Sequence, residues 1–307
     1  MIKRIFLFVA VNLLVLFVIN IVIHVLGVRP YLGAHGMDYQ ALLIFCAIFG
    51  FVGSFISLQM SRFMAKHALG VVLIDPRNPG PEGARLVETV SRICQRAGMT
   101  TLPEIGVYPS REVNAFATGP SRSRSLVAVS AGLLERMDSK AVEGVLAHEV
   151  SHIVNGDMVT MTLLQGVANT FVMFASRVAV FAINNFLRSR DDNGRGLGYF
   201  AQYLLIMVFE TVFMLLAMIV VYWFSRRREF AADRGSAELA GRETMIHALE
   251  SLRDHKNKVD HEHESLATLK IHGGSRGLIA LLYSSHPPLE ERIAALERQE
   301  PLSRMTV

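Results

Sequence analysis

The stretch 145–153 reads Val-Leu-Ala-His-Glu-Val-Ser-His-Ile and lies within an apolar pattern of helical period. Because residues four apart stand on one face of a helix, the imidazoles of His148 and His152 can occupy adjacent corners of one tetrahedral zinc site. Glu149 is then placed to act on a metal-bound water rather than on the metal. The stretch predicts a catalytic zinc helix in a hydrolase. A structural metal or a chance match is the alternative.

The composition predicts an integral membrane protein. Hydrophobic residues make up 51% of the 307 residues, and the mean hydropathy is +0.34. The excess is concentrated in the four segments 5–26, 41–58, 161–187 and 200–224. A helix needs roughly 20 apolar residues to cross the hydrocarbon core of a bilayer. We therefore expect four transmembrane helices.

The third and fourth segments contain polar groups. Arg177 and the Asn184-Asn185 pair lie in the third, and Glu210 lies in the fourth. Ionisable side chains inside a span are costly and normally face protein or a water-filled cavity. Arg177 and Glu210 could offset this cost by pairing with each other. The alternative is a hydrophobic hairpin beside the catalytic domain that does not cross the membrane.

The basic residues predict the orientation. Lys and Arg cluster at 3–4, 62–66 and 226–228, which fall on one side of the membrane if all four segments cross. This side should be the cytoplasm, so the protein is expected to be a multi-pass membrane protein with a cytoplasmic active site; the family resemblance described below implies that the membrane is a bacterial inner (plasma) membrane. The segment 5–26 is too long for a signal-peptide core and reads as a retained anchor.

Charge and cysteine content exclude other classes. The formal net charge of +4 fits juxtamembrane anchoring, and because no basic stripe with interleaved aromatics is present, no nucleic-acid partner is expected. Cys46 and Cys94 lie far apart and form no C-x-x-C motif. They predict neither a disulfide framework nor a thiolate metal site, and both are interpreted as packing residues in a reducing compartment.

The remaining sequence predicts a soluble unit in two parts. Asp138 is a candidate N-cap for the helix that carries the two histidines. The expected fold class is mostly α with a small β-sheet, that is, transmembrane helices plus a cytoplasmic zinc metalloprotease domain, which the resemblance described below implies to be gluzincin-like. The expected domains are 1–60 (two spans), 61–160 (first catalytic part), 161–224 (two further spans) and 225–307 (second catalytic part). The expected elements are helices 82–97, 226–239, 243–256 and 290–299, strands 103–108, 113–118 and 125–130, a turn at 119–123, and a charged loop at 260–264.

A catalytic zinc needs a third protein ligand. Asp157 is close in sequence but is expected to point away from the ligand face of the same helix. Glu229 opens Glu-Phe-Ala-Ala-Asp, in which Glu229 and Asp233 share one helical face. Glu229 could bind zinc while Asp233 accepts a hydrogen bond from a ligand histidine. The alternative is a surface salt bridge of Glu229 with neighbouring arginines of 226–234.

Four motifs resemble the HtpX family of membrane zinc endopeptidases, gluzincins related to the CAAX prenyl endopeptidases. They are His-Glu-Val-Ser-His at 148–152, Arg-Arg-Glu-Phe-Ala-Ala-Asp at 227–233, Asn-Ala-Phe-Ala-Thr-Gly at 114–119, and Ser-His-Pro-Pro-Leu-Glu-Glu-Arg at 285–292. They stand in the family's order, and with the hydrophobic segments the resemblance covers nearly the whole chain.

The resemblance implies one Zn²⁺ per chain. It makes His148, His152 and Glu229 the zinc ligands, Glu149 the catalytic base, and Asp233 the residue behind a ligand histidine.

It also implies a substrate-binding edge strand and two further catalytic groups. Asn114, Ala115, Phe116 and Ala117 match the strand onto which substrate backbone is added. His286 and Arg292 match positions near the reacting carbonyl. From the residues alone, His286 could equally be a buried packing histidine, and Arg292 a charge on a helix surface.

The function expected from the resemblance is hydrolysis of misfolded or damaged membrane proteins at the cytoplasmic face. The alternative is a processing peptidase for one lipidated or secreted peptide, and a non-enzymatic scaffold with structural zinc is a third reading. Expected partners are the lipid bilayer and unfolded protein substrates, with other membrane proteases as candidate partners.

Overall fold

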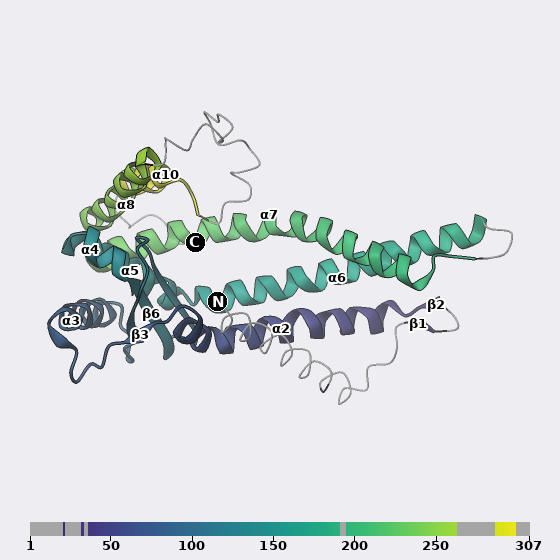
Figure 1. The fold of residues 1–307 in the computed structure, drawn as a ribbon, viewed down its shortest axis with the longest axis horizontal. Coiled ribbons are helices and arrows are strands. Elements are labelled where there is room, and N and C mark those ends of the chain that lie inside the picture. Colours follow the sequence, from purple (N-terminus) through teal and green to yellow (C-terminus); the bar gives the residue numbers. More distant parts are fainter. Residues whose placement is uncertain (1–20, 22–31, 34–35, 191–194, 263–285, 299–307) are drawn as a thin grey trace. The chain divides into compact units, whose positions relative to one another are not determined.

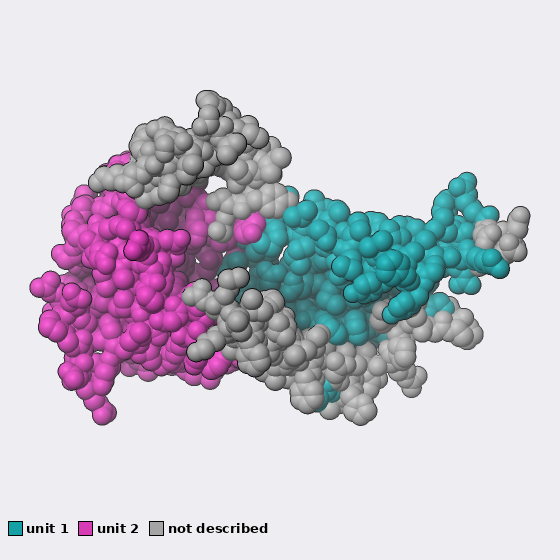
Figure 2. Space-filling model, in the orientation of Figure 1, with its two compact units in different colours: residues 1–58, 160–221 teal, residues 59–159, 222–307 magenta. Residues whose placement is uncertain are grey.

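The computed structural model describes residues 21, 32–33, 36–190, 195–262 and 286–298 (Figure 1). The segment 5–26, interpreted as the first span, lies outside the described residues apart from residue 21. The chain forms two compact units, residues 1–58 with 160–221 and residues 59–159 with 222–307 (Figure 2). Each unit is therefore built from two separate parts of the sequence.

The described part of the first unit consists mainly of segments of three long helices, each of which extends into residues of the second unit. They are α2 (Tyr39–Ala68), α6 (Asp157–Arg190) and α7 (Tyr199–Ala240), and each is long and apolar enough to cross a membrane. They contain the segments 41–58, 161–187 and 200–224 that the sequence singles out. Two short strands, β1 (Leu32–Gly33) and β2 (Gly36–Met37), pair before α2.

The ionisable residues of α6 and α7 pair with each other. Arg177 Nη1 lies 2.7 Å from Glu210 Oε1, and the Arg177 guanidinium lies 5.9 Å from the centroid of the Phe45 ring on α2. Helices α2 and α6 pack closely at Gly50. A Cβ at this position would lie 2.6 Å from the Gly166 carbonyl oxygen, which is too close for any larger residue. Small residues at such crossings let membrane helices approach closely.

The second unit contains a four-stranded sheet of order β3-β4-β6-β5. The strands are β3 (Val72–Leu73), β4 (Glu104–Tyr108), β5 (Ala115–Ser121) and β6 (Arg124–Ser130). Strands β4 and β6 are parallel, and the other pairs are antiparallel. The three predicted strands are present, and β3 is an addition. The predicted turn 119–123 is shorter, because β5 continues to Ser121 through a register shift at Gly119, whose φ is 140°.

Both faces of the sheet are covered. Helices α3 (Gly80–Arg96) and α5 (Ser139–Asn155) pack on one face, where Val127 and Val129 of β6 are buried. Alternate residues Leu126 and Ala128 are buried on the other face, with Ala65 near the end of α2. Alternation of side chains along a strand explains this division. Cys94 lies in the core beside α5, and burial raises the pKa of its thiol to about 11, as expected of a packing residue.

Helix α5 is fixed at both ends and along its length. Asp138 caps its start, and Gly156 ends it in the left-handed conformation at φ 70°. The short α4 (Ala131–Arg136) precedes it. Helix α8 (Arg242–Glu262) packs on α5 at Gly144, where an added Cβ would lie 2.7 Å from the Ala248 Cβ. Helix α10 (Leu289–Glu297) packs on α8. These contacts hold the helix that carries His148 and His152.

Substitution of Asp138 by Ala should destabilise the second unit. Asp138 accepts a hydrogen bond of 2.8 Å from the Ala141 N–H and lies 2.7 Å from His247 Nε2; loss of such a cap costs about 1 kcal/mol. The Ala141 N–H and then His247 lower the pKa of Asp138. This stabilisation is therefore present above the unfolded-state pKa of about 3.9 and is lost as the pH falls through the lower folded-state pKa.

Thermal unfolding of the metal-free protein in detergent measures this effect. The gap in Tm between wild type and Asp138→Ala should shrink as the pH falls below about 4. Asp254→Ala, an exposed acid on α8, serves as the control. A gap that stays constant into the acid range would show that the carboxylate charge plays no part.

Candidate zinc site

The three predicted zinc ligands lie together in the second unit. His148 and His152 come from α5 and Glu229 from α7, and one ligand atom of each lies within 4.8 Å of the others. The two Nε2 atoms are 3.1 Å apart. Glu229 Oε1 lies 3.4 Å from His152 Nε2, and its Oε2 lies 3.5 Å from His148 Nε2. Glu229 is only 1% exposed, which is inconsistent with a surface salt bridge.

The outer nitrogen of each histidine faces a carboxylate. His148 Nδ1 lies 2.9 Å from Asp233 Oδ1, and His152 Nδ1 lies 2.6 Å from Asp157 Oδ2. Because an ionised carboxylate only accepts, each Nδ1–H donates, which leaves the lone pairs of both Nε2 atoms facing each other and the Glu229 carboxylate. The two Nε2 lone pairs and the Glu229 carboxylate are all acceptors, so they repel one another unless a cation lies among them. The residues therefore fit a zinc ion.

Asp157 does not continue the helix of His152, so that part of the expectation was wrong, whereas the group that could hold a metal does not include Asp157, as expected. Helix α5 ends at Asn155, and Gly156 turns the chain so that Asp157 becomes the first residue of a new helix, α6. This turn brings the Asp157 carboxylate back to His152. The Asn155-Gly156 pair is the local signal that could have revealed the turn, since Gly commonly follows the last helical residue.

Burial and charge act in opposite directions on the two histidines. Burial lowers the pKa of His148, but Asp233 and Glu229 outweigh it, and the pKa stands above its ordinary value. At His152 burial is likewise outweighed by Asp157 and Glu229, which raise the pKa to about 9. The neighbouring carboxylates favour the protonated form of both rings, and zinc must compete with that proton, so acid weakens zinc binding.

Arg292 is buried rather than a charge on a helix surface. It is 6% exposed, and its Nε donates to Asp233 Oδ2 over 2.8 Å while Nη2 contacts the other carboxylate oxygen. Two parallel hydrogen bonds of this kind fix the carboxylate plane. Arg292 therefore acts on the site through Asp233 and His148.

Glu149 and His286 are both more exposed than the ligand Glu229. Glu149 is half-buried, and its negative charge acts on both His152 and Arg292. His286 is not a buried packing histidine, since its side chain is 65% exposed and its Nδ1 lies 2.8 Å from Glu229 Oε2.

The four predicted substrate-binding residues lie at an edge of the sheet. Within the described residues, β5 pairs with β6 on one side and with no strand on the other. Ala115 and Ala117 face α5, while Phe116 lies on the opposite face with its ring centroid 5.6 Å from that of Tyr108. Asn114, just before the strand, donates its N–H to Ser130 Oγ over 3.1 Å. The outer edge of β5 therefore has backbone groups that can pair with an added strand.

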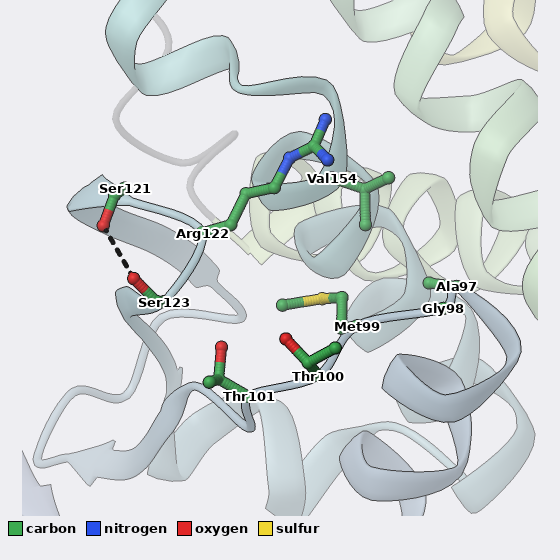
Figure 3. A pocket seen from close by; sticks show the side chains of 9 residues that line it. All are labelled: Ala97, Gly98, Met99, Thr100, Thr101, Ser121, Arg122, Ser123 and Val154. Carbon is green, nitrogen blue, oxygen red and sulfur yellow. Dashed lines mark hydrogen bonds between the residues drawn. The ribbon is translucent and has the colours of Figure 1, made fainter.

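A separate pocket of about 420 Å³ lies between the α3–β4 connection and the β5–β6 turn (Figure 3). Arg122 reaches over it, and Ser121 and Ser123 hydrogen-bond at its rim (Figure 3). Its lining comprises Ala97, Gly98, Met99, Thr100, Thr101, Ser121, Arg122, Ser123 and Val154. The zinc group does not contribute to this pocket.

The helical fold, the membrane-type helices and the His-Glu-x-x-His group together define a membrane-bound zinc metallopeptidase. Residues 82–300 match the model of Peptidase family M48, and the chain belongs to this family. It is 50% identical to a Protease HtpX homolog of Bacillus subtilis (strain 168), over 97% of this chain and 99% of the relative. It is 51% identical to the Protease HtpX of Shewanella sp. (strain MR-4), over 96% and 99%.

A solved structure shares the fold. The crystal structure of S. mikatae Ste24p is 19% identical, with a TM-score of 0.64, and the match covers 97% of this chain. The chain spans 65% of the length of that structure. At this identity the likeness concerns the fold alone.

Proposed function

We propose that the protein cleaves misfolded or damaged membrane proteins at the cytoplasmic face of the bacterial inner membrane. The convergence of His148, His152 and Glu229 beside Glu149 is the observation that carries the proposal. In the residue roles proposed here, the first three hold one zinc and Glu149 is the general base.

The chain's own groups divide the work of hydrolysis. A zinc ion held by His148, His152 and Glu229 would supply a Lewis acid and would lower the pKa of water at the site towards about 7. Glu149 takes the proton of the attacking water and delivers it to the leaving amine. His286, exposed at the site, donates to the oxygen that becomes negative.

Two further groups prepare the site. Arg292 holds Asp233, which in turn orients His148. The outer edge of β5 takes up the substrate backbone as an added strand, a mode that reads little side-chain sequence.

The breadth of cleavage separates quality control from dedicated processing. Arg177 and Glu210 satisfy each other across 2.7 Å, which supports a structural role rather than recognition of one substrate within the bilayer. Purified protein should therefore cut several unrelated unfolded membrane proteins at many positions, with the Glu149→Gln variant as the blank. Cleavage of one substrate at a single site would favour the processing role.

We further propose that 161–187 and 200–224 both cross the membrane, placing the intervening segment opposite the zinc site. Cysteine placed at Asn193, with Cys46 and Cys94 replaced, should react with a membrane-impermeant thiol reagent once the outer barrier of the cells is permeabilised. The reason is that α6 and α7 are each long enough to span and that arginines 226–228 stop the second on the cytoplasmic side. Labelling only after the inner membrane is broken would favour the hairpin that does not cross.

A further inference from the structure

Asp157 occupies the same position relative to His152 as Asp233 does relative to His148. We propose that Asp157 is a positioning residue for the zinc site, which fixes the His152 ring with Nε2 toward the metal. This inference rests on the proposed zinc role of His148, His152 and Glu229. It adds a residue that the sequence patterns above do not assign to the site.

Burial and geometry make the Asp157 contact specific. Asp157 is 6% exposed, and its Oδ2 lies 2.6 Å from His152 Nδ1. Because the carboxylate holds the Nδ1 proton, the lone pair of the ring lies on Nε2, which is the atom that faces His148 and Glu229. A carboxylate behind a ligand histidine fixes its tautomer and increases its basicity as a ligand.

Arg228 completes the arrangement on this side. Its Nη1 lies 3.7 Å from Asp157 Oδ2, and its Nη2 lies 4.0 Å from Glu229 Oε1. On the other side, Arg292 contacts Asp233, and its Nη1 lies 3.7 Å from Glu229 Oε2. Each ligand histidine therefore has a carboxylate at its Nδ1, and an arginine lies near each of these carboxylates: Arg292 near Asp233 and Arg228 near Asp157.

A purely structural role is the competing explanation. Asp157 is the acidic residue in the first turn of α6, where a negative charge favours the helix dipole. In that case its loss would weaken the helix but leave the metal affinity unchanged. Both explanations allow a loss of stability when Asp157 is replaced, but only the positioning role predicts a loss of zinc affinity.

Zinc affinity of the full-length protein in detergent, measured by competition with a chromophoric chelator, tests the proposal. Asp157→Ala should weaken zinc binding about 10–100-fold. Asp157→Asn should show a smaller loss, because the amide oxygen still accepts from Nδ1 but carries no charge. The visible spectrum of the cobalt-substituted protein should change in Asp157→Ala. The matched control is Asp254→Asn, an exposed acid on α8, which should bind zinc like wild type.

Zinc affinity of Asp157→Ala within about twofold of wild type, where a loss of about 10–100-fold is expected, would overturn the proposal, as would an unchanged cobalt spectrum in that variant. The near-isosteric Asn variant decides the question if the Ala variant does not fold. His148→Ala, measured in parallel, separates this inference from the proposed function. Retention of zinc by His148→Ala would show that the assignment of the zinc ligands is wrong, and this result would not depend on the role of Asp157.

Discussion

The Glu149→Gln variant should bind one zinc per chain and hydrolyse peptide bonds roughly two to four orders of magnitude more slowly than wild type. Glutamine preserves the size of the side chain and removes only the carboxylate that accepts a proton. Zinc should be retained, because the predicted ligands are His148, His152 and Glu229. If proton transfer is the lost step, kcat should fall more than KM changes.

Two measurements on the same preparation make this comparison decisive. Zinc content separates loss of metal from loss of the base, and turnover of an unfolded protein reports the chemistry. Glu238→Gln, an exposed residue of α7, controls for loss of a glutamate elsewhere in the chain. Near-normal turnover by Glu149→Gln, in protein free of contaminating protease, would remove Glu149 from the mechanism.

The second large effect concerns the metal ligands. His148→Ala, His152→Ala and Glu229→Ala should each lose zinc more severely than the 10–100-fold typical of a residue behind a ligand. Activity should disappear with the zinc, because a site left with two protein ligands falls short of the three usual in catalytic zinc sites. Metal analysis after dialysis against a weak chelator measures the loss, with Glu238→Ala as the control. Full zinc occupancy in Glu229→Ala would exclude that residue from the ligand set.

Local patterns in the sequence predict much of this fold. Helical period and cap signals predict α5 from Asp138 onward, and the cap hydrogen bond to Ala141 is present. A short run with apolar Leu126, Val127 and Val129 predicts β6, and length with composition predicts the three described membrane-type helices. The i, i+4 spacing of His148 and His152 sets both on one helical face without any long-range information. These features depend on residues close together in the chain, so a single sequence is sufficient to predict them.

Contacts between distant residues were harder to predict. Arg292 reads as a charge on a helix surface because its partner Asp233 is 59 positions away in sequence. The role of Asp157 depends on one left-handed residue, Gly156, that interrupts an otherwise continuous helical pattern. Helix α8 extends to Glu262, beyond the predicted end at 256, so residues 260–262 of the predicted charged loop are helical, and residues 263–264 lie outside the described residues.

Zinc titration of the metal-free protein, with hydrolysis of an unfolded protein as the readout, tests the central claim most directly. We expect no hydrolysis without metal and activity that rises with added zinc to saturate at one zinc per chain. This follows from the single group of His148, His152 and Glu229 found in the described part of the chain. Hydrolysis by the metal-free protein, or one bound zinc per chain without any hydrolysis, would contradict the assignment of a zinc endopeptidase.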